Sequence, residues 1–132
     1  MSPKYRMWNR ITSKLHHVTG LYFDSKEVQY TDEFGILRFI KFKNTILMQS
    51  TGLKDKNGKE IFEGDIITDG TSIVDVKSYQ TLGFYTVVNG EERFFGSNTS
   101  IKDFENGVEE FSSVTEIIGN IYENPELLEE TE

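Results

Sequence analysis

The complete absence of alanine is the feature that most limits what this chain of 132 residues can fold into. Alanine is the most favourable residue at helical positions, so a sequence without it is poorly suited to long helices. The same sequence has eight valines, twelve isoleucines and twelve threonines, and 13% of its residues are aromatic. Side chains branched at Cβ and aromatic rings fit the pleated surface of a sheet. We therefore predict a mostly β protein built from antiparallel strands.

Length, cysteine content and hydropathy narrow the class of protein further. A chain of this length suits one domain, or one domain with an extension. The absence of cysteine excludes disulfides, thiol catalysis and thiolate zinc sites, and it fits a reducing compartment. No apolar run reaches the roughly 18 residues of a membrane span, and no signal peptide is evident. We expect a soluble protein that uses no cofactor and does not enter a membrane.

Charge is distributed unevenly along the chain. Residues 1–60 contain eleven Lys or Arg and six Asp or Glu, whereas residues 61–132 contain three and sixteen. Either the basic part contacts nucleic acid, or the two halves attract one another within a molecule or between copies. The overall net charge of −8 disfavours tight nonspecific binding to a polyanion, because the acidic half repels phosphates.

Short apolar stretches separated by turn signals indicate the strands of the first half. They are Tyr5–Trp8 (an edge strand or an anchored arm), Leu15–Phe23 (a strand with a turn), Val28–Tyr30 and Ile36–Phe42, with a hairpin turn at Thr31–Gly35.

The stretch Ile36–Phe42 has two different faces. Alternation places Arg38, Ile40 and Phe42 on one side and Leu37, Phe39 and Lys41 on the other. Neither side is purely apolar, so we expect this strand to lie at a sheet edge or at a subunit contact.

The second half carries its own turn signals and strands. We predict hairpin turns at Asn57-Gly58 and Asn89-Gly90 and a bend at Gly64-Asp65. We predict strands at Ile73–Lys77, Phe84–Val88 and Val114–Tyr122, and a short helix after Asn124-Pro125. A soft boundary falls near Ser50, where the charge balance changes. We therefore divide the chain into an N-terminal β region, residues 1–50, and a C-terminal region, residues 51–132.

Carboxylates gather between Glu60 and Asp69, and paired carboxylates can perform acid–base chemistry or hold a divalent cation. On an extended chain Glu63 and Asp65 lie on the same face. In the alternative interpretation, which we favour, Glu63-Gly64-Asp65 forms a bend in which Asp65 accepts backbone N–H groups. The segment Asp55–Glu60 superficially suggests a calcium loop, but its glutamate follows the glycine too closely, and a turn is the better interpretation.

His16 and His17 are the only histidines. Neighbouring residues of a strand point to opposite faces, so the two side chains make a poor chelate. No nucleophile elbow and no phosphate-binding glycine loop occurs. We assign no catalytic, cofactor-binding or metal-binding residue.

Two segments mix aromatic and basic residues, Lys4–Arg10 and Arg38–Lys43. Small β proteins bind single strands by stacking bases on exposed rings above a basic groove. The candidate nucleic-acid contacts are Trp8, Arg38, Lys41 and Lys43. In the alternative interpretation, Trp8, Phe39 and Phe42 anchor a core or an interface while the cations lie in solvent.

Three blocks, Lys4–Trp8, Gln49–Ile67 and Ile118–Leu128, are similar to the signatures of the YopX-like family of bacteriophage and prophage proteins, in the same order. The resemblance implies a mostly β protein whose C-terminal part is a small Src-homology-3-like barrel. It also implies an origin in phages of Gram-positive hosts, an unknown biochemical role, and residence in the cytoplasm of the bacterial host. No catalytic residue accompanies the family. The residues that punctuate the three blocks, which we expect to determine the structure, are Trp8, Gly52, Asn57, Gly58, Gly64, Asp65, Gly119, Asn120 and Pro125.

These observations lead to three hypotheses. The first is a non-enzymatic phage accessory protein that works through protein contacts, including contacts between its own copies. The second is a weak nucleic-acid-binding protein that acts during phage replication or transcription. The third, an enzyme acting through Glu63 and Asp65, has the least support.

Overall fold

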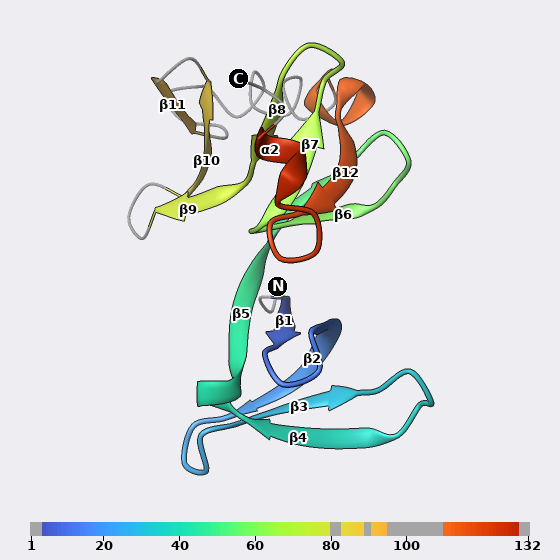
Figure 1. Cartoon of the computed structure of the whole chain (residues 1–132), viewed down its shortest axis with the longest axis vertical. Coiled ribbons are helices and arrows are strands. Elements are labelled where there is room, and N and C mark those ends of the chain that lie inside the picture. Colours follow the sequence, from blue (N-terminus) through green and yellow to red (C-terminus); the bar gives the residue numbers. More distant parts are fainter. Residues whose placement is uncertain (1–3, 80–82, 89–90, 95–109, 130–132) are drawn as a thin grey trace. The chain divides into compact units, whose positions relative to one another are not determined.

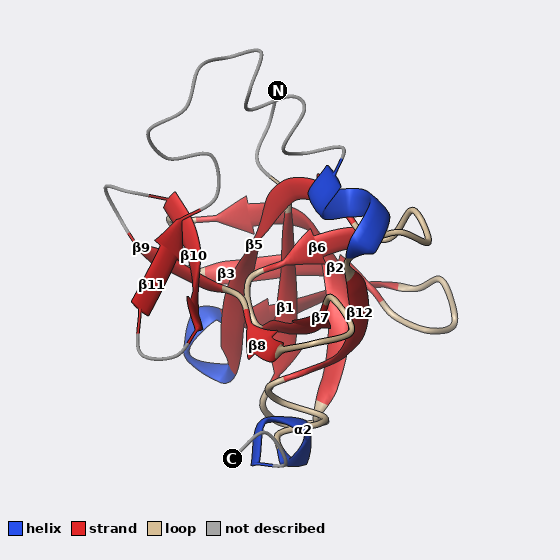
Figure 2. Cartoon of the chain, turned by 90° about the horizontal axis from the view of Figure 1, so that it is seen from above, coloured by secondary structure: helices blue, strands red, loops and turns tan. Residues whose placement is uncertain are grey.

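A computed structural model describes residues 4–79, 83–88, 91–94 and 110–129 of the chain. Antiparallel strands dominate these residues and the helices are short (Figure 2), which confirms the predicted fold class at this level. The chain divides into two compact units, Met1–Ser50 and Thr51–Glu132. No helix in the described ranges is long and apolar enough to cross a membrane.

Unit 1 is one twisted antiparallel sheet. Its elements, labelled in Figure 1, are β1 (Tyr5–Asn9), β2 (Lys14–Tyr22), β3 (Glu27–Thr31), β4 (Leu37–Lys41), the 3-10 helix η1 (Phe42–Asn44) and β5 (Thr45–Lys54), which continues into unit 2. The strand order is β4-β3-β2-β1-β5. Trp8 faces Leu15 on one side and Ile46 on the other. The predicted edge position of Tyr5–Trp8 is therefore wrong, because β1 has a second partner far along the sequence.

The core of unit 1 lies on one side of this sheet. Met7, Val28, Tyr30 and Ile40 are buried there, and the partly buried side chains packed against them are Val18, Leu21, Phe42 and Leu47. The alternation predicted for Ile36–Phe42 is confirmed, since Ile40 and Phe42 both contribute to this core.

Unit 2 contains shorter strands. They are β6 (Glu60–Phe62), β7 (Asp65–Thr68), β8 (Ile73–Asp75), β9 (Lys77–Tyr79), β10 (Gly83–Val88), β11 (Glu91–Phe94) and β12 (Glu116–Asn120), followed by α2 (Glu126–Glu129). They form two three-stranded sheets, β12-β7-β8 and β11-β10-β9, while β6 pairs with β5. The described strands do not close into a barrel, so they do not show the Src-homology-3-like barrel that the resemblance implies.

Local predictions in unit 2 succeed in part. The hairpin between Phe84–Val88 and residue 91 onward is confirmed by β10 and β11, although its turn, residues 89–90, lies outside the described residues. The short helix after Pro125 is also confirmed. The strand predicted from Val114 begins only at Glu116, because residues 110–114 are helical.

The predicted strand Ile73–Lys77 is two strands in two sheets. Val76, which is buried, separates β8 from β9. Its backbone N–H donates to the carbonyl of Asp65 at 2.9 Å, and its carbonyl accepts the N–H of Gly64 at the same distance. The chain therefore changes sheets where the backbone of Val76 is held by the bend at Gly64.

The central and closing sequence blocks meet in unit 2. Asp65 of β7 faces Asn120 of β12, and the N–H of Ile121 donates to the carbonyl of Gly64 at 2.9 Å. Around this pair lies the core of Ile61, Ile67 and Val76, with Leu53, Val74, Phe111 and Ile117 packed against it.

Asn120 and Gly119 explain why the closing block needs these residue types. The Asn120 side chain is buried, and its Oδ1 accepts the N–H groups of Tyr122 and Glu123 at 3.0 and 2.9 Å. A Cβ on Gly119 would lie only 2.6 Å from Oδ1 of Asn124. Glycine is therefore required where the turn folds back onto the strand.

The described residues contain the same kind of turn in both units. In Asp32–Ile36 and Asp55–Lys59, the fourth residue is a glycine with positive φ, +78° at Gly35 and +81° at Gly58. In both turns the glycine N–H donates to the aspartate carbonyl at 3.0 Å, and one carboxylate oxygen accepts two backbone N–H groups at 2.9 Å. This is a type I turn closed by a left-handed residue, and it confirms the turn predicted at Asn57-Gly58.

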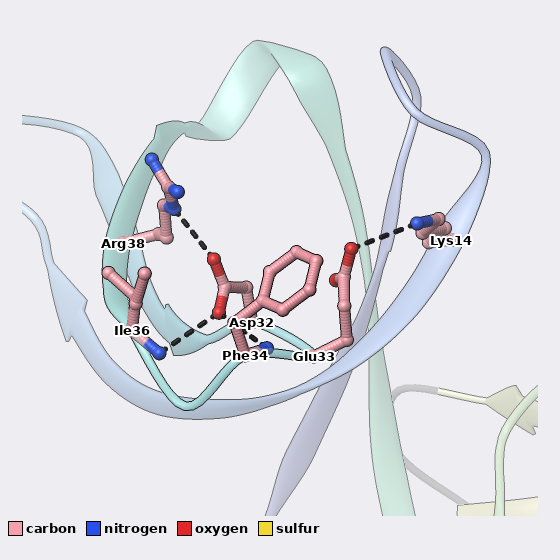
Figure 3. A network of polar contacts seen from close by, with 6 residues as sticks. All are labelled: Lys14, Asp32, Glu33, Phe34, Ile36 and Arg38. Carbon is pink, nitrogen blue, oxygen red and sulfur yellow. Dashed lines mark hydrogen bonds and ion pairs between the residues drawn. The ribbon is translucent and has the colours of Figure 1, made fainter.

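The second carboxylate oxygen distinguishes the two turns. Oδ2 of Asp55 accepts the N–H of Ile117 in β12 at 3.1 Å, and the Asp55 residue is buried. Oδ2 of Asp32 instead accepts Nε of Arg38 at 2.8 Å on the surface of unit 1 (Figure 3). Asp55 therefore joins two distant segments, whereas Asp32 stiffens a hairpin.

The hydrogen bonds of Asp55 and Asp32 lower the pKa of both carboxyl groups. Burial opposes ionisation of Asp55, but N–H groups of Ile117, Lys59 and Asn57 outweigh it, so the pKa of its carboxyl lies below the usual value. The Arg38 hydrogen bond, followed by the N–H of Ile36, lowers the pKa of Asp32.

Replacing Asp55 should destabilise unit 2 strongly. Asp55→Ala leaves three backbone N–H groups without their acceptor, two in the turn and one on β12, and we expect a loss of about 3 kcal/mol in the free energy of unfolding. Asp32→Ala is the matched control, because it removes the same two turn contacts but cuts no link to a distant strand: the second oxygen of Asp32 binds only the side chain of Arg38. Urea denaturation followed by circular dichroism measures both variants, and equal losses would contradict the structural distinction.

Stability should also fall with acid through Asp55. Its carboxyl is protonated more readily in the unfolded chain, where the pKa is about 3.9, than in the folded one. The contribution is therefore complete above about pH 4 and is lost as the pH falls through the folded pKa. Urea midpoints measured across this range should decline less steeply for Asp55→Asn than for the natural chain. Parallel curves would show that Asp55 does not carry the effect.

Candidate functional site

On the side of the unit 1 sheet opposite its core, β4 carries exposed apolar side chains. The β3–β4 register pairs Val28 with Ile40 on the core side and Gln29 with Phe39 on the opposite side. Leu37 and Phe39 are 53% and 52% exposed. Apolar side chains on this strand therefore face away from the core, as the sequence alternation predicted.

A tyrosine from β2 joins these residues. The rings of Tyr22 and Phe39 lie with their centroids 5.8 Å apart, and the Tyr22 hydroxyl lies 3.4 Å from Oε1 of Gln29. Gly20 makes this arrangement possible, because a Cβ there would lie 2.8 Å from Oε1 of Gln29 and 3.2 Å from the Tyr22 ring. We call the surface formed by Tyr22, Gln29, Leu37 and Phe39 the outer face.

Sequence reasoning did not identify Tyr22. Unbroken alternation from Val18 would put Tyr22 on the core side, but the β2–β3 register shifts between Val18 and Gly20. This bulge inserts one residue and reverses the faces of everything that follows it. A glycine within a strand pattern is the available signal, and it does not reveal the position of the inserted residue.

The β3–β4 hairpin is held by contacts at its turn. Besides the Asp32–Arg38 pair, Nζ of Lys14 lies 3.0 Å from Oε1 of Glu33. Figure 3 shows one of these pairs on each side of the turn. The pKa of Glu33 is lowered, first by its backbone N–H and then by Lys14. Phe34, at the tip, is 77% exposed. Ion pairs thus hold the turn in place while the apolar side chain of Phe34 is exposed at its tip.

The four residues proposed to contact nucleic acid lie in different places. Arg38 leaves β4 on the same side as Ile40 and is paired with Asp32, whereas Lys41 leaves the other side and lies 3.8 Å from Glu27. Lys43 is exposed in η1, beyond the strand. Trp8 lies on β1, separated from β4 by two strands, or about 14 Å at the usual spacing. The structure does not bring them together.

The carboxylate cluster forms a bend instead of a site with two facing acids. Asp65 is buried and its Oδ2 accepts the N–H of Phe62 at 2.8 Å, while Gly64 has a φ of +88°. This confirms the interpretation of Glu63-Gly64-Asp65 as a bend. Among the residues with described positions, no group of three or more His, Asp or Glu side chains is arranged to hold a metal ion.

The two histidines point to opposite sides of β2, as expected. The His16 ring contacts the ring of Tyr30, with centroids 4.6 Å apart, on the core side. His17 is exposed.

Comparison with known proteins places the chain in a family. Residues 4–129 match the family model described as YopX protein. The crystal structure of protein EF1440 from Enterococcus faecalis is similar, with a TM-score of 0.52, 30% sequence identity, and coverage of 97% of this chain and 99% of that one. No curated protein matches the sequence. Since the family match spans nearly the whole sequence, the chain belongs to the YopX protein family.

Proposed function

We propose that this protein is a non-enzymatic interaction module of a bacteriophage or prophage, working through protein contacts that include its own copies. The observation that carries the proposal is the outer face, where Tyr22, Leu37 and Phe39 are about half exposed on a regular strand surface. Aromatic side chains gathered on an exposed face are typical of protein interfaces. The phage setting, in the cytoplasm of a bacterial host, rests on the family resemblance.

The charges of the two units support association between copies. Residues 1–50 contain eight Lys or Arg and four Asp or Glu, whereas residues 51–132 contain six and eighteen. Unit 1 is therefore basic and unit 2 strongly acidic. Attraction between unit 1 of one copy and unit 2 of another would steer encounters and weaken with salt, whereas burial of the outer face would not.

The acidic side chains support a role without catalysis. Asp55 and Asp65 are buried and accept backbone N–H groups, and Asp69 accepts those of Thr71 and Ser72 at 2.8 and 2.9 Å. N–H groups of Ser72 and then Thr71 lower the pKa of Asp69. Carboxylates that turn N–H groups keep ionised, as at Asp55 and Asp69, are poor proton donors near neutral pH. Their hydrogen bonds fit structural roles.

Light scattering tests the self-association. We expect a mass above 15.2 kDa that rises with protein concentration, and partial loss of association in high salt. Leu37→Ser should weaken association about tenfold, because it removes roughly 1.4 kcal/mol of apolar burial at the contact. Ile11→Ser is the matched control, since Ile11 is exposed in the β1–β2 turn, away from the outer face. A mass of 15.2 kDa at every concentration in both salts would refute self-association.

The exposed ring of Phe39 also favours a second candidate, a weak nucleic-acid-binding protein. Phe39 lies beside Tyr22 on the outer face, and Lys41 leaves the strand on the same side. Bases of a single strand could stack on these rings while Lys41 and Lys43 approach the backbone. Against it, Lys41 already has an acidic neighbour, Glu27.

Fluorescence anisotropy with a labelled single-stranded oligonucleotide of about twelve nucleotides tests this candidate. Joint replacement of Arg38, Lys41 and Lys43 by Glu should abolish binding. Joint replacement of Lys54, Lys56 and Lys59 by Glu is the matched control, because it changes charge equally in unit 2. Absence of binding by the natural chain, or equal loss in both variants, would exclude the outer face as a nucleic-acid site.

A further inference from the structure

The outer edge of β4 carries backbone groups that the sheet does not use. Within the described residues, β4 ends the sheet of unit 1. At its two ends, the carbonyl of Ile36 accepts the N–H of Asp32, and the N–H of Phe42 donates to the carbonyl of Lys26. Because hydrogen-bonded residues alternate in an antiparallel pair, Arg38 and Ile40 also point their backbone groups toward β3. Those of Leu37, Phe39 and Lys41 therefore point outward.

From this pattern we propose that two copies join through β4, edge to edge and antiparallel, with Phe39 of each copy facing its counterpart across a two-fold axis. The inference rests on the proposed function and deepens it by naming the partner, a second copy, and the register. Leu37 then faces Lys41 of the partner subunit, and each facing pair of outward residues exchanges two backbone hydrogen bonds. The two sheets become one.

The charges of β4 select this register. With Phe39 on the axis, Arg38 lies opposite Ile40 of the partner subunit, and each cation faces an apolar residue. A shift that pairs Leu37 with the partner's Phe39 would put the two Arg38 side chains opposite one another, which is unfavourable. A shift in the other direction pairs Phe39 with the partner's Lys41 and leaves Leu37 beyond the end of the partner's strand. The central register alone pairs all five residues.

Lysines on an edge strand usually hinder its pairing with another chain, but the cations of β4 do not. Arg38 is 2.8 Å from Asp32, and Lys41 is 3.8 Å from Glu27, so both charges have partners within their own copy. Meanwhile the apolar side chains at the edge are half exposed. Pairing two edges would extend the outer face into a continuous surface in which the two Phe39 rings are neighbours.

Opposite charges placed on the axis test the register. Phe39→Glu and Phe39→Lys should each weaken association at least tenfold, because two like charges then face one another, while a mixture of the two variants should associate again. Phe39 is exposed, so neither change disturbs the core. The same two substitutions at Ile11 are the control and should leave association unchanged. Light scattering of each variant and of the mixture measures the result. Failure of the mixture to associate would overturn the register.

A single cysteine gives an independent measurement, because the chain contains none. After oxidation with copper phenanthroline, Phe39→Cys should yield a disulfide-linked dimer, whereas Ile11→Cys should remain monomeric on a nonreducing gel. If the natural chain associates but Phe39→Cys does not cross-link and Phe39→Glu associates normally, the β4 pairing is wrong and the proposed function stands. If the natural chain is monomeric throughout, the proposed self-association fails as well.

Discussion

The carboxylate of Asp55 is the interaction on which unit 2 depends. It closes its own turn through the N–H groups of Asn57 and Lys59, and with its second oxygen it holds the N–H of Ile117, 62 residues away. Next to it, the N–H of Lys56 donates to the carbonyl of Thr115. A turn and a distant strand are thus fixed by one buried charge, and β12 is positioned to pair with β7. In that pairing Asp65 of the central block faces Asn120 of the closing block.

The same turn serves a different purpose in unit 1. Asp32 closes the β3–β4 turn as Asp55 closes its own, but its second oxygen binds Arg38 at the surface. The β3–β4 turn is therefore held by its own Asp32–Arg38 pair and by Lys14 of β2, which binds Glu33. The apolar side chains of β4 remain exposed, among them Leu37 and Phe39. The same turn therefore links two distant segments in unit 2 and supports a strand with exposed apolar side chains in unit 1.

Sequence reasoning succeeded where the determinant is local and failed where it is distant. The two faces of Ile36–Phe42 and the turn at Asn57-Gly58 follow from alternation and from glycine, and both are observed. The interior place of β1 depends on pairing with Thr45–Gln49, which no local pattern reveals. The division of the strand at Val76 depends on hydrogen bonds with Gly64 and Asp65. Of the outer face, Leu37 and Phe39 could be placed from sequence, whereas Tyr22 could not, because a single bulge decides its side.

Among the described residues, polar and apolar groups have different roles. Polar side chains that could act in catalysis, such as Asp55 and Asp65, are buried and bonded to backbone, and replacing their partners would cost the fold itself. The groups that folding leaves available are of another kind: the rings of Tyr22 and Phe39, and the outward N–H and carbonyl groups of β4. Rings and free strand edges recognise other chains without breaking bonds. In the proposed dimer, specificity comes from register, because a shift in one direction puts the two Arg38 side chains opposite one another and a shift in the other direction leaves Leu37 beyond the partner's strand.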